Sequence, residues 1–131
     1  MKVLALDFGA ARTGVAVSDP TGTLARPLCV VERAAGDEGL AELARIVEEQ
    51  GAERIVVGLP LTLRGTRGEQ ASATERFAAG LRAVVGVPVV LYDERFTTDL
   101  AQQTPSAAQQ DALAAAHLLS SYLAWAGAAT A

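Results

Sequence analysis

The chain has 131 residues and a formal net charge of −4, and half of its residues are hydrophobic. This length favours one domain with a core of its own, and the acidic balance excludes a global basic field that would attract nucleic acid. The lone Cys29 excludes an intrachain disulfide and a cysteine-based zinc site. No segment has the pattern of a leader or a membrane span. We therefore expect a soluble, cytoplasmic protein with a single domain over residues 1–131 and a frayed tail after about residue 127.

The beginning of the chain predicts a β-hairpin. The apolar run Val3–Leu6 ends at Asp7, the chain turns at Gly9, and a second β-rich run extends from Gly14 to Asp19. Two short β-rich runs joined by a glycine-containing turn are typical of a hairpin. Because the first run shows little polar alternation, we expect its strand to be covered on both faces, near the middle of a sheet. A carboxylate at the end of such a strand needs a partner, either a metal ion or a hydrogen bond within the turn.

Strand and helix patterns alternate after the hairpin. A third strand at residues 24–32 contains Pro27, which confines it to an edge of the sheet. Next we expect a helix over 37–50 ended by Gly51, a buried strand at 55–57 and a polar loop at 62–68. A helix from about 69 to 85, a strand at 87–92 and a short helical piece at 99–103 follow. The last helix begins at a Ser106–Gln109 capping box and ends near residue 126. This order predicts an α/β fold, a five-stranded mixed sheet with an N-terminal β-hairpin and helices on both faces. The strands after residue 50 need crossovers and should run parallel to the first.

Acidic residues follow the strands that this order brings together. Asp7 ends the first strand, Asp93 and Glu94 end the last strand, and Asp111 lies in the first turns of the final helix. Sites in α/β sheets form beyond the carboxyl ends of the strands, so Asp7 and Glu94 would meet there and the final helix can bring Asp111. Convergent carboxylates repel one another, and Mg²⁺ or Mn²⁺ relieves that repulsion with hard oxygen ligands. Taken singly, each acid is more simply explained as a solvated charge at the end of an element.

Six stretches of the sequence carry a resemblance to a known family. In chain order they are LALDFGAARTGVAVSD (4–19), IVVGLP (55–60), GEQ (68–70), RF (76–77), DERFTT (93–98) and DALAAAHLLSSYL (111–123). They resemble the YqgF/RuvX family of RNase H-like proteins, described as Holliday junction resolvase-like and as nucleases that mature small-subunit ribosomal RNA precursors. The resemblance implies an RNase H-like fold, phosphodiester cleavage with Mg²⁺ or Mn²⁺, and Asp7, Glu94 and Asp111 as the catalytic and metal-binding acids. Family members usually carry a run of Lys and Arg before the final helix, where this chain has the uncharged residues 102–110.

Candidate contacts to the nucleic-acid backbone are the arginines near these acids: Arg12, Arg64, Arg67 and Arg95. Arg12 can hold a substrate phosphate or pair with Asp7 or Asp19. The loop that contains Arg64 and Arg67 either steers a phosphate backbone or is a solvated face.

Three further residues stand next to the acidic motif after the last strand: Asp93, Thr97 and Thr98. The threonines are expected to cap a short helical piece and to orient the ligands from outside the first shell of a metal ion. Asp93 is also the alternative to Glu94 as a ligand, and Arg95 can orient Glu94 or touch a phosphate.

The expected function is that of a divalent-metal-dependent nuclease acting on RNA, in maturation of the small-subunit ribosomal RNA precursor. The alternatives are a Holliday junction resolvase-like DNA endonuclease and a non-catalytic adaptor that binds RNA or ribosomal particles. The hairpin also resembles the phosphate-binding hairpin of actin-like and sugar-kinase ATPases, but from the length of 131 residues we expect no second domain of the kind that such ATPases close on a nucleotide. We expect nucleic acid as the partner, with RNA ahead of DNA, no membrane, and a monomer or homodimer.

Overall fold

The computed structural model describes residues 1–59, 68–93 and 107–130 of the chain. Five strands and three helices follow one another in these ranges: β1 (Val3–Asp7), β2 (Arg12–Ser18), β3 (Ala25–Glu32), α1 (Asp37–Gln50), β4 (Arg54–Leu59), α2 (Glu69–Arg82), β5 (Val89–Asp93) and α3 (Ala107–Thr130). Residues 62–67 of the predicted loop at 62–68, the short helical piece at 99–103 and the capping residue Ser106 lie outside the described residues. The order of elements is the one that the sequence predicts.

The strands form one mixed sheet in the order β3-β2-β1-β4-β5. β1 pairs with β2 in antiparallel orientation and with β4 in parallel orientation, and β5 is parallel to β4. β1 is therefore the central strand, and β3 with its Pro27 is at an edge, as expected. The carboxyl ends of β1, β4 and β5 lie at the same edge of the sheet, because these three strands are parallel.

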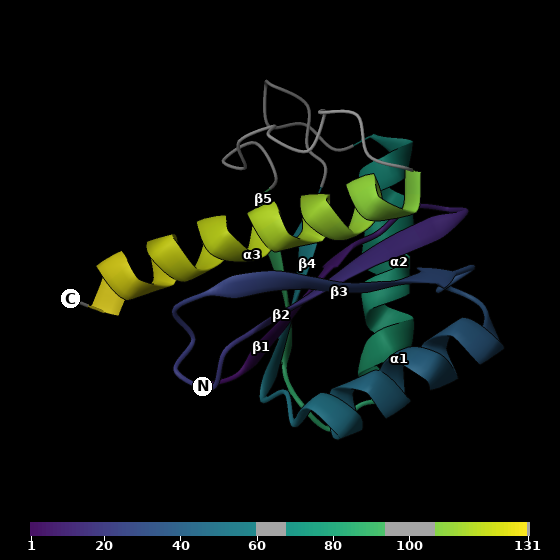
Figure 1. Ribbon diagram of the computed structural model, residues 1–131. Helices are drawn as coiled ribbons and strands as arrows, with labels where there is room; N and C mark the ends of the chain where they lie inside the picture. Colours follow the sequence, from purple (N-terminus) through teal and green to yellow (C-terminus); the bar gives the residue numbers. More distant parts are fainter. Residues whose placement is uncertain (60–67, 94–106, 131) are drawn as a thin grey trace.

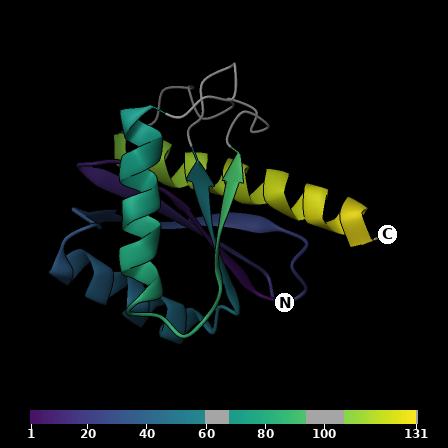
Figure 2. The ribbon, with the colours of Figure 1, turned by 180° about the vertical axis from the view of Figure 1, so that it is seen from behind.

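Alternation along β1 separates two apolar layers. Leu4 and Leu6 are buried in a core that α1 and α2 complete, whereas Val3 and Ala5 are buried in a second core beneath α3. The view of Figure 1 has α3 in front of the sheet, and the view from behind in Figure 2 has α2 in front. The helices thus cover both faces of the sheet, and successive side chains of β1 point to opposite layers.

The ends of the helices follow local chemistry. α1 has the predicted bounds, and Gly51 ends it in the left-handed conformation, with φ of 65°. α2 ends at Arg82, a turn earlier than expected, with hydrogen bonds from the N–H groups of Ala83 and Val84 to carbonyls three residues before. β5 begins at Val89 because Pro88 has no N–H to donate to the ladder. In the described ranges, no helix combines the length and the apolar character that a bilayer crossing requires.

Candidate active site

Asp7 lies at the carboxyl end of the central strand. Val3 and Ala5 of the same strand pack beneath α3, so alternation places Asp7 on the α3 face as well. Asp7 is partly buried, and its partner across the β1–β2 ladder is Gly14. The first predicted acid is therefore at the edge where parallel strands end, on the side covered by the last helix.

Gly14 allows α3 to come into backbone contact with the sheet. A Cβ atom at this position would lie 1.8 Å from the carbonyl oxygen of Asp111 and 2.4 Å from its carbonyl carbon. Such a contact is impossible for any residue with a side chain. Because residues paired across an antiparallel ladder are only about 5 Å apart at Cα, the contact brings Asp111 close to Asp7. The structure thus brings Asp7 and Asp111 to one corner of the sheet, the acidic corner.

The Asp111 carboxylate has an arginine beside it. The Nε atom of Arg12 lies 3.0 Å from Oδ2 of Asp111, and the side chains are 44% and 31% exposed. Oδ2 itself is buried, and within the described part of the chain no donor makes a properly aligned hydrogen bond to it. From the sequence, Asp7 and Asp19 were the expected ion-pair partners of Arg12. In the structure its partner is Asp111.

Asp19 has another local environment. The hydroxyl of Thr21 donates to its carboxylate, and the backbone N–H groups of Thr23 and Leu24 donate at 2.8 and 2.9 Å. These hydrogen bonds favour the charged form and hold the pKa of Asp19 well below its usual range, the Thr21 bond contributing most. Asp19 therefore stabilises the turn between β2 and β3 and takes no part in the acidic corner.

Asp93 ends β5 opposite Leu59 of β4. Tyr92 and Val90 pack in the layer beneath α3, whereas Val89 belongs to the opposite layer. By alternation, Asp93 lies on the face opposite to Asp7. The side chain of Asp93 therefore starts from the face away from α3, unlike that of Asp7.

The other predicted site residues lie outside the described residues: Glu94, Arg95, Thr97, Thr98, Arg64 and Arg67. Within the described ranges, no group of three His, Cys, Asp or Glu residues forms a metal site. The donors that are described nevertheless suit a hard divalent cation, because both are carboxylates and one buried oxygen of Asp111 lacks an aligned hydrogen bond. The described part of the corner thus contains two carboxylates, the kind of group that such an ion prefers.

An aromatic stack supports the β1–β2 turn next to Asp7. The rings of Phe8 and Phe77 are 4.4 Å apart at their centroids and nearly parallel, at 13°. Phe77 is buried in α2, so the stack ties the turn to a helix on the face away from α3. Neither the ring contact of Phe8 nor the backbone contact of Gly14 was among the expectations from the sequence, although a glycine inside an apolar strand is a signal of close backbone approach.

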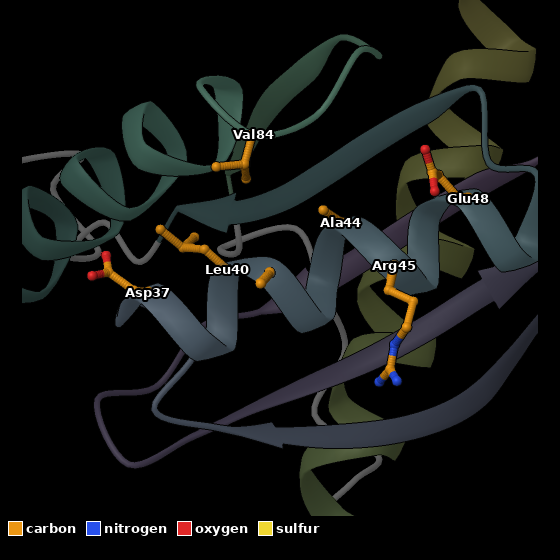
Figure 3. A pocket seen from close by; sticks show the side chains of 7 residues that line it. Asp37, Leu40, Ala44, Arg45, Glu48 and Val84 are labelled. Carbon is orange, nitrogen blue, oxygen red and sulfur yellow. The ribbon is translucent and has the colours of Figure 1, made fainter.

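A groove of about 520 Å³ lies elsewhere, along α1 and next to Val84 (Figure 3). Its lining includes Leu40, Ala44, Arg45 and Glu48 and no residue of the acidic corner. This groove is therefore separate from the candidate active site.

Comparison with known proteins gives the family. The family model RuvX, described as Holliday junction resolvase, matches residues 1–125. The chain is 41% identical over 130 residues to a protein of Chloroflexus aurantiacus, which covers 92% of this chain and 85% of the relative. It is 43% identical over 134 residues to a protein of Geobacillus kaustophilus, covering 94% of this chain and 97% of the relative. Both relatives carry the name "Putative pre-16S rRNA nuclease".

A solved structure confirms the expected fold class. T. thermophilus RuvC in complex with a Holliday junction substrate superposes with a TM-score of 0.65 and 20% identity, covering 100% of this chain and 98% of RuvC. This likeness concerns the RNase H-like fold alone. The family match over nearly the whole chain and the identity to both relatives show that the chain belongs to the RuvX family.

Proposed function

We propose that this protein is a nuclease that hydrolyses phosphodiester bonds of RNA with a divalent cation, in maturation of the small-subunit ribosomal RNA precursor. The observation that carries the proposal is the meeting of Asp7 and Asp111, which the backbone contact at Gly14 brings to one corner of the sheet. The names of the relatives from Chloroflexus and Geobacillus support the choice of substrate. A nuclease of ribosomal RNA precursors works where ribosomes are assembled, so the proposal includes a cytoplasmic location.

Asp7, Asp111 and Glu94 are the proposed ligands of Mg²⁺ or Mn²⁺. Neighbours along a strand point to opposite faces, so the position of Asp93 away from α3 favours Glu94 as the third acid. When bound, the cation supplies an activated water and stabilises the leaving oxygen of the phosphodiester. These acids would hold the ion beyond the carboxyl ends of the strands, where the phosphodiester would also have to bind.

Four arginines are proposed to hold the nucleic-acid backbone: Arg12, Arg64, Arg67 and Arg95. Arg12 is supported by its place beside Asp111 and by its 44% exposed side chain. Its planar guanidinium can bind two phosphate oxygens at once. Contacts from arginines to phosphates position a strand without reading its bases.

We further propose that Asp93, Thr97 and Thr98 orient the acids that bind the cation and the chain around them.

Cleavage of a Holliday junction is the second candidate, because the matching family model is described as a resolvase. A junction presents paired cleavage sites and favours a two-fold dimer. The low content of basic residues, 11 Lys and Arg against 15 Asp and Glu, argues against tight binding of long duplexes. RNA is therefore the preferred substrate class.

A substrate panel separates the two candidates. Wild-type protein and an Asp7→Asn variant would be incubated with Mn²⁺ or Mg²⁺ and with single-stranded RNA, a structured RNA precursor, single-stranded DNA or a four-way junction. We expect RNA cleavage by the wild type only, with Mn²⁺ at least as effective as Mg²⁺. A symmetric cut of the junction without RNA cleavage would identify a resolvase, and binding without cleavage of any substrate would identify an adaptor.

A further inference from the structure

The contact between Arg12 and Asp111 joins two residues with different proposed tasks. Oδ2 of Asp111 is buried, and Nε of Arg12 at 3.0 Å supplies positive charge next to it. A buried carboxylate oxygen is costly unless a partner compensates its charge. Arg12 is such a partner, because its guanidinium is a positively charged group with several N–H donors in a planar arrangement. Among the described residues, Arg12 thus provides the positive charge that a cation would provide.

Arg12 is also free to leave this position. Its side chain is 44% exposed, and it is the first residue of β2, at the rim of the acidic corner. The residue directly opposite in the β2–β3 ladder is Glu32, whose exposed carboxylate is within reach of a cross-strand partner. Glu32 and a phosphate from solvent are therefore candidate alternative partners of the guanidinium.

We propose that Arg12 and the divalent cation compete for the carboxylate of Asp111. In the metal-free protein Arg12 holds Asp111 in place and balances its charge, and on cation binding it moves away toward the rim. This inference rests on the proposed function for the existence of the cation site. It makes Arg12 a positioning residue whose release adds an unpaired positive charge where the substrate phosphate enters. By linkage, a phosphate that captures Arg12 would tighten cation binding.

The test is Mn²⁺ binding in the absence of nucleic acid, followed by electron paramagnetic resonance of free Mn²⁺. Arg12→Gln removes the charge and keeps a polar side chain of similar reach. We expect this variant to bind Mn²⁺ about two- to fivefold more tightly than the wild type, because the ion no longer has to break the ion pair between Arg12 and Asp111. This range corresponds to the free energy of an ion pair between partly exposed groups. Arg12→Lys keeps the charge and should bind Mn²⁺ as the wild type does.

A matched control separates competition from a change in net charge. Arg45→Gln removes one positive charge on α1, where Arg45 pairs with Glu42 at 3.5 Å and with Glu49 at 3.9 Å, away from the acidic corner. This variant should bind Mn²⁺ with the affinity of the wild type. In an Asp111→Asn background, Arg12→Gln should no longer tighten Mn²⁺ binding, because the carboxylate for which the two cations compete is gone.

Thermal unfolding gives a second readout. Without metal, Arg12→Gln should lower the Tm, because the buried oxygen of Asp111 loses its compensating charge. Saturating Mn²⁺ should bring the Tm of this variant level with that of the wild type, because the ion then supplies that charge in both proteins.

Two results would overturn the competition. One is Mn²⁺ binding by Arg12→Gln that is no tighter than that of the wild type, and the other is an equal gain in Arg45→Gln. Neither result bears on whether the wild type cleaves RNA, because Mn²⁺ binding is measured here without nucleic acid. Conversely, tighter Mn²⁺ binding by Arg12→Gln together with a wild type that cleaves no substrate would leave the competition standing and refute the nuclease.

Discussion

Gly14 and Asp111 touch through their backbones where α3 meets the sheet. A Cβ on Gly14 would come within 1.8 Å of the Asp111 carbonyl oxygen. Since Gly14 is also the ladder partner of Asp7, this one contact determines how far the first turns of α3 lie from the end of β1. The geometry of the acidic corner therefore depends on a residue that carries no functional group.

The first prediction is that Gly14→Ala damages both stability and activity. The new methyl group meets main-chain atoms, which cannot move aside cheaply, so the beginning of α3 has to shift. We expect unfolding in urea to show a loss of about 1–3 kcal/mol, as for other overpacked sites. RNA cleavage should fall with it, because Asp111 moves away from Asp7. Gly86→Ala is the control, since a Cβ at Gly86 meets nothing within 4 Å. Equal activity of the two variants would contradict this role of Gly14.

The second prediction concerns the three acids. Asp7→Asn, Glu94→Gln and Asp111→Asn should each abolish cleavage at saturating metal while circular dichroism shows an intact fold. Combining them should add little, because groups that act as one unit give non-additive losses.

The control for the acids is Glu49→Gln, which removes an exposed carboxylate on α1 and should leave cleavage at the wild-type rate. Asp93→Asn should cause a smaller loss than Glu94→Gln, because Asp93 lies on the face away from α3. Near-wild-type rates in all three acid variants would refute the proposed site.

A third prediction follows from the low pKa of Asp19. Hydrogen bonds to its carboxylate lower the pKa in the folded state, so the stabilisation is present above the unfolded-state pKa, about 3.9, and is lost as pH falls toward the folded-state value. Asp19→Asn should therefore lower the Tm at pH 7, and the difference from wild type should shrink below about pH 4. Melting curves between about pH 2 and pH 7 measure it. A difference that stays constant over this range would show that the charge of Asp19 is unimportant.

The fourth prediction tests the loop that contains Arg64 and Arg67. Replacing both with Ala should weaken binding of two unrelated single-stranded oligonucleotides equally and flatten the log-log salt dependence by roughly 0.7 per lost contact. Cleavage at saturating substrate should change little, since the acids are untouched. The control replaces Arg26 and Arg45, two exposed arginines on β3 and α1, with the same loss of charge. An unchanged salt slope in the loop variant would assign docking to Arg12 and Arg95.

Much of the fold is determined by local sequence. The apolar run before Asp7, the glycine-containing turn and the second apolar run predict the hairpin that the structure shows. Likewise, helical spacing over 37–50 with Gly51 after it predicts both ends of α1. Such features are predictable because periodicity and the conformations open to glycine act within a few residues.

The acidic corner is only partly predictable in this way. The sequence placed Asp7 at the end of a central strand and Asp111 in the first turns of the last helix, and the family resemblance named both as acids of the site. It did not indicate that Gly14 lets the two meet or that Arg12 pairs with Asp111. The contribution of Glu94 remains a prediction.

These contacts join residues about a hundred positions apart in the chain, and tertiary structure alone decides them. Whether α3 crosses the sheet over Gly14, and at what height, depends on how the apolar face that includes Leu119 and Tyr122 packs against Val3, Ala5 and Ala16. Packing of this kind is a property of the whole layer and leaves no local period in the sequence. The sequence therefore determined which groups are available for the chemistry, and the packing of α3 on the sheet decided which of them meet.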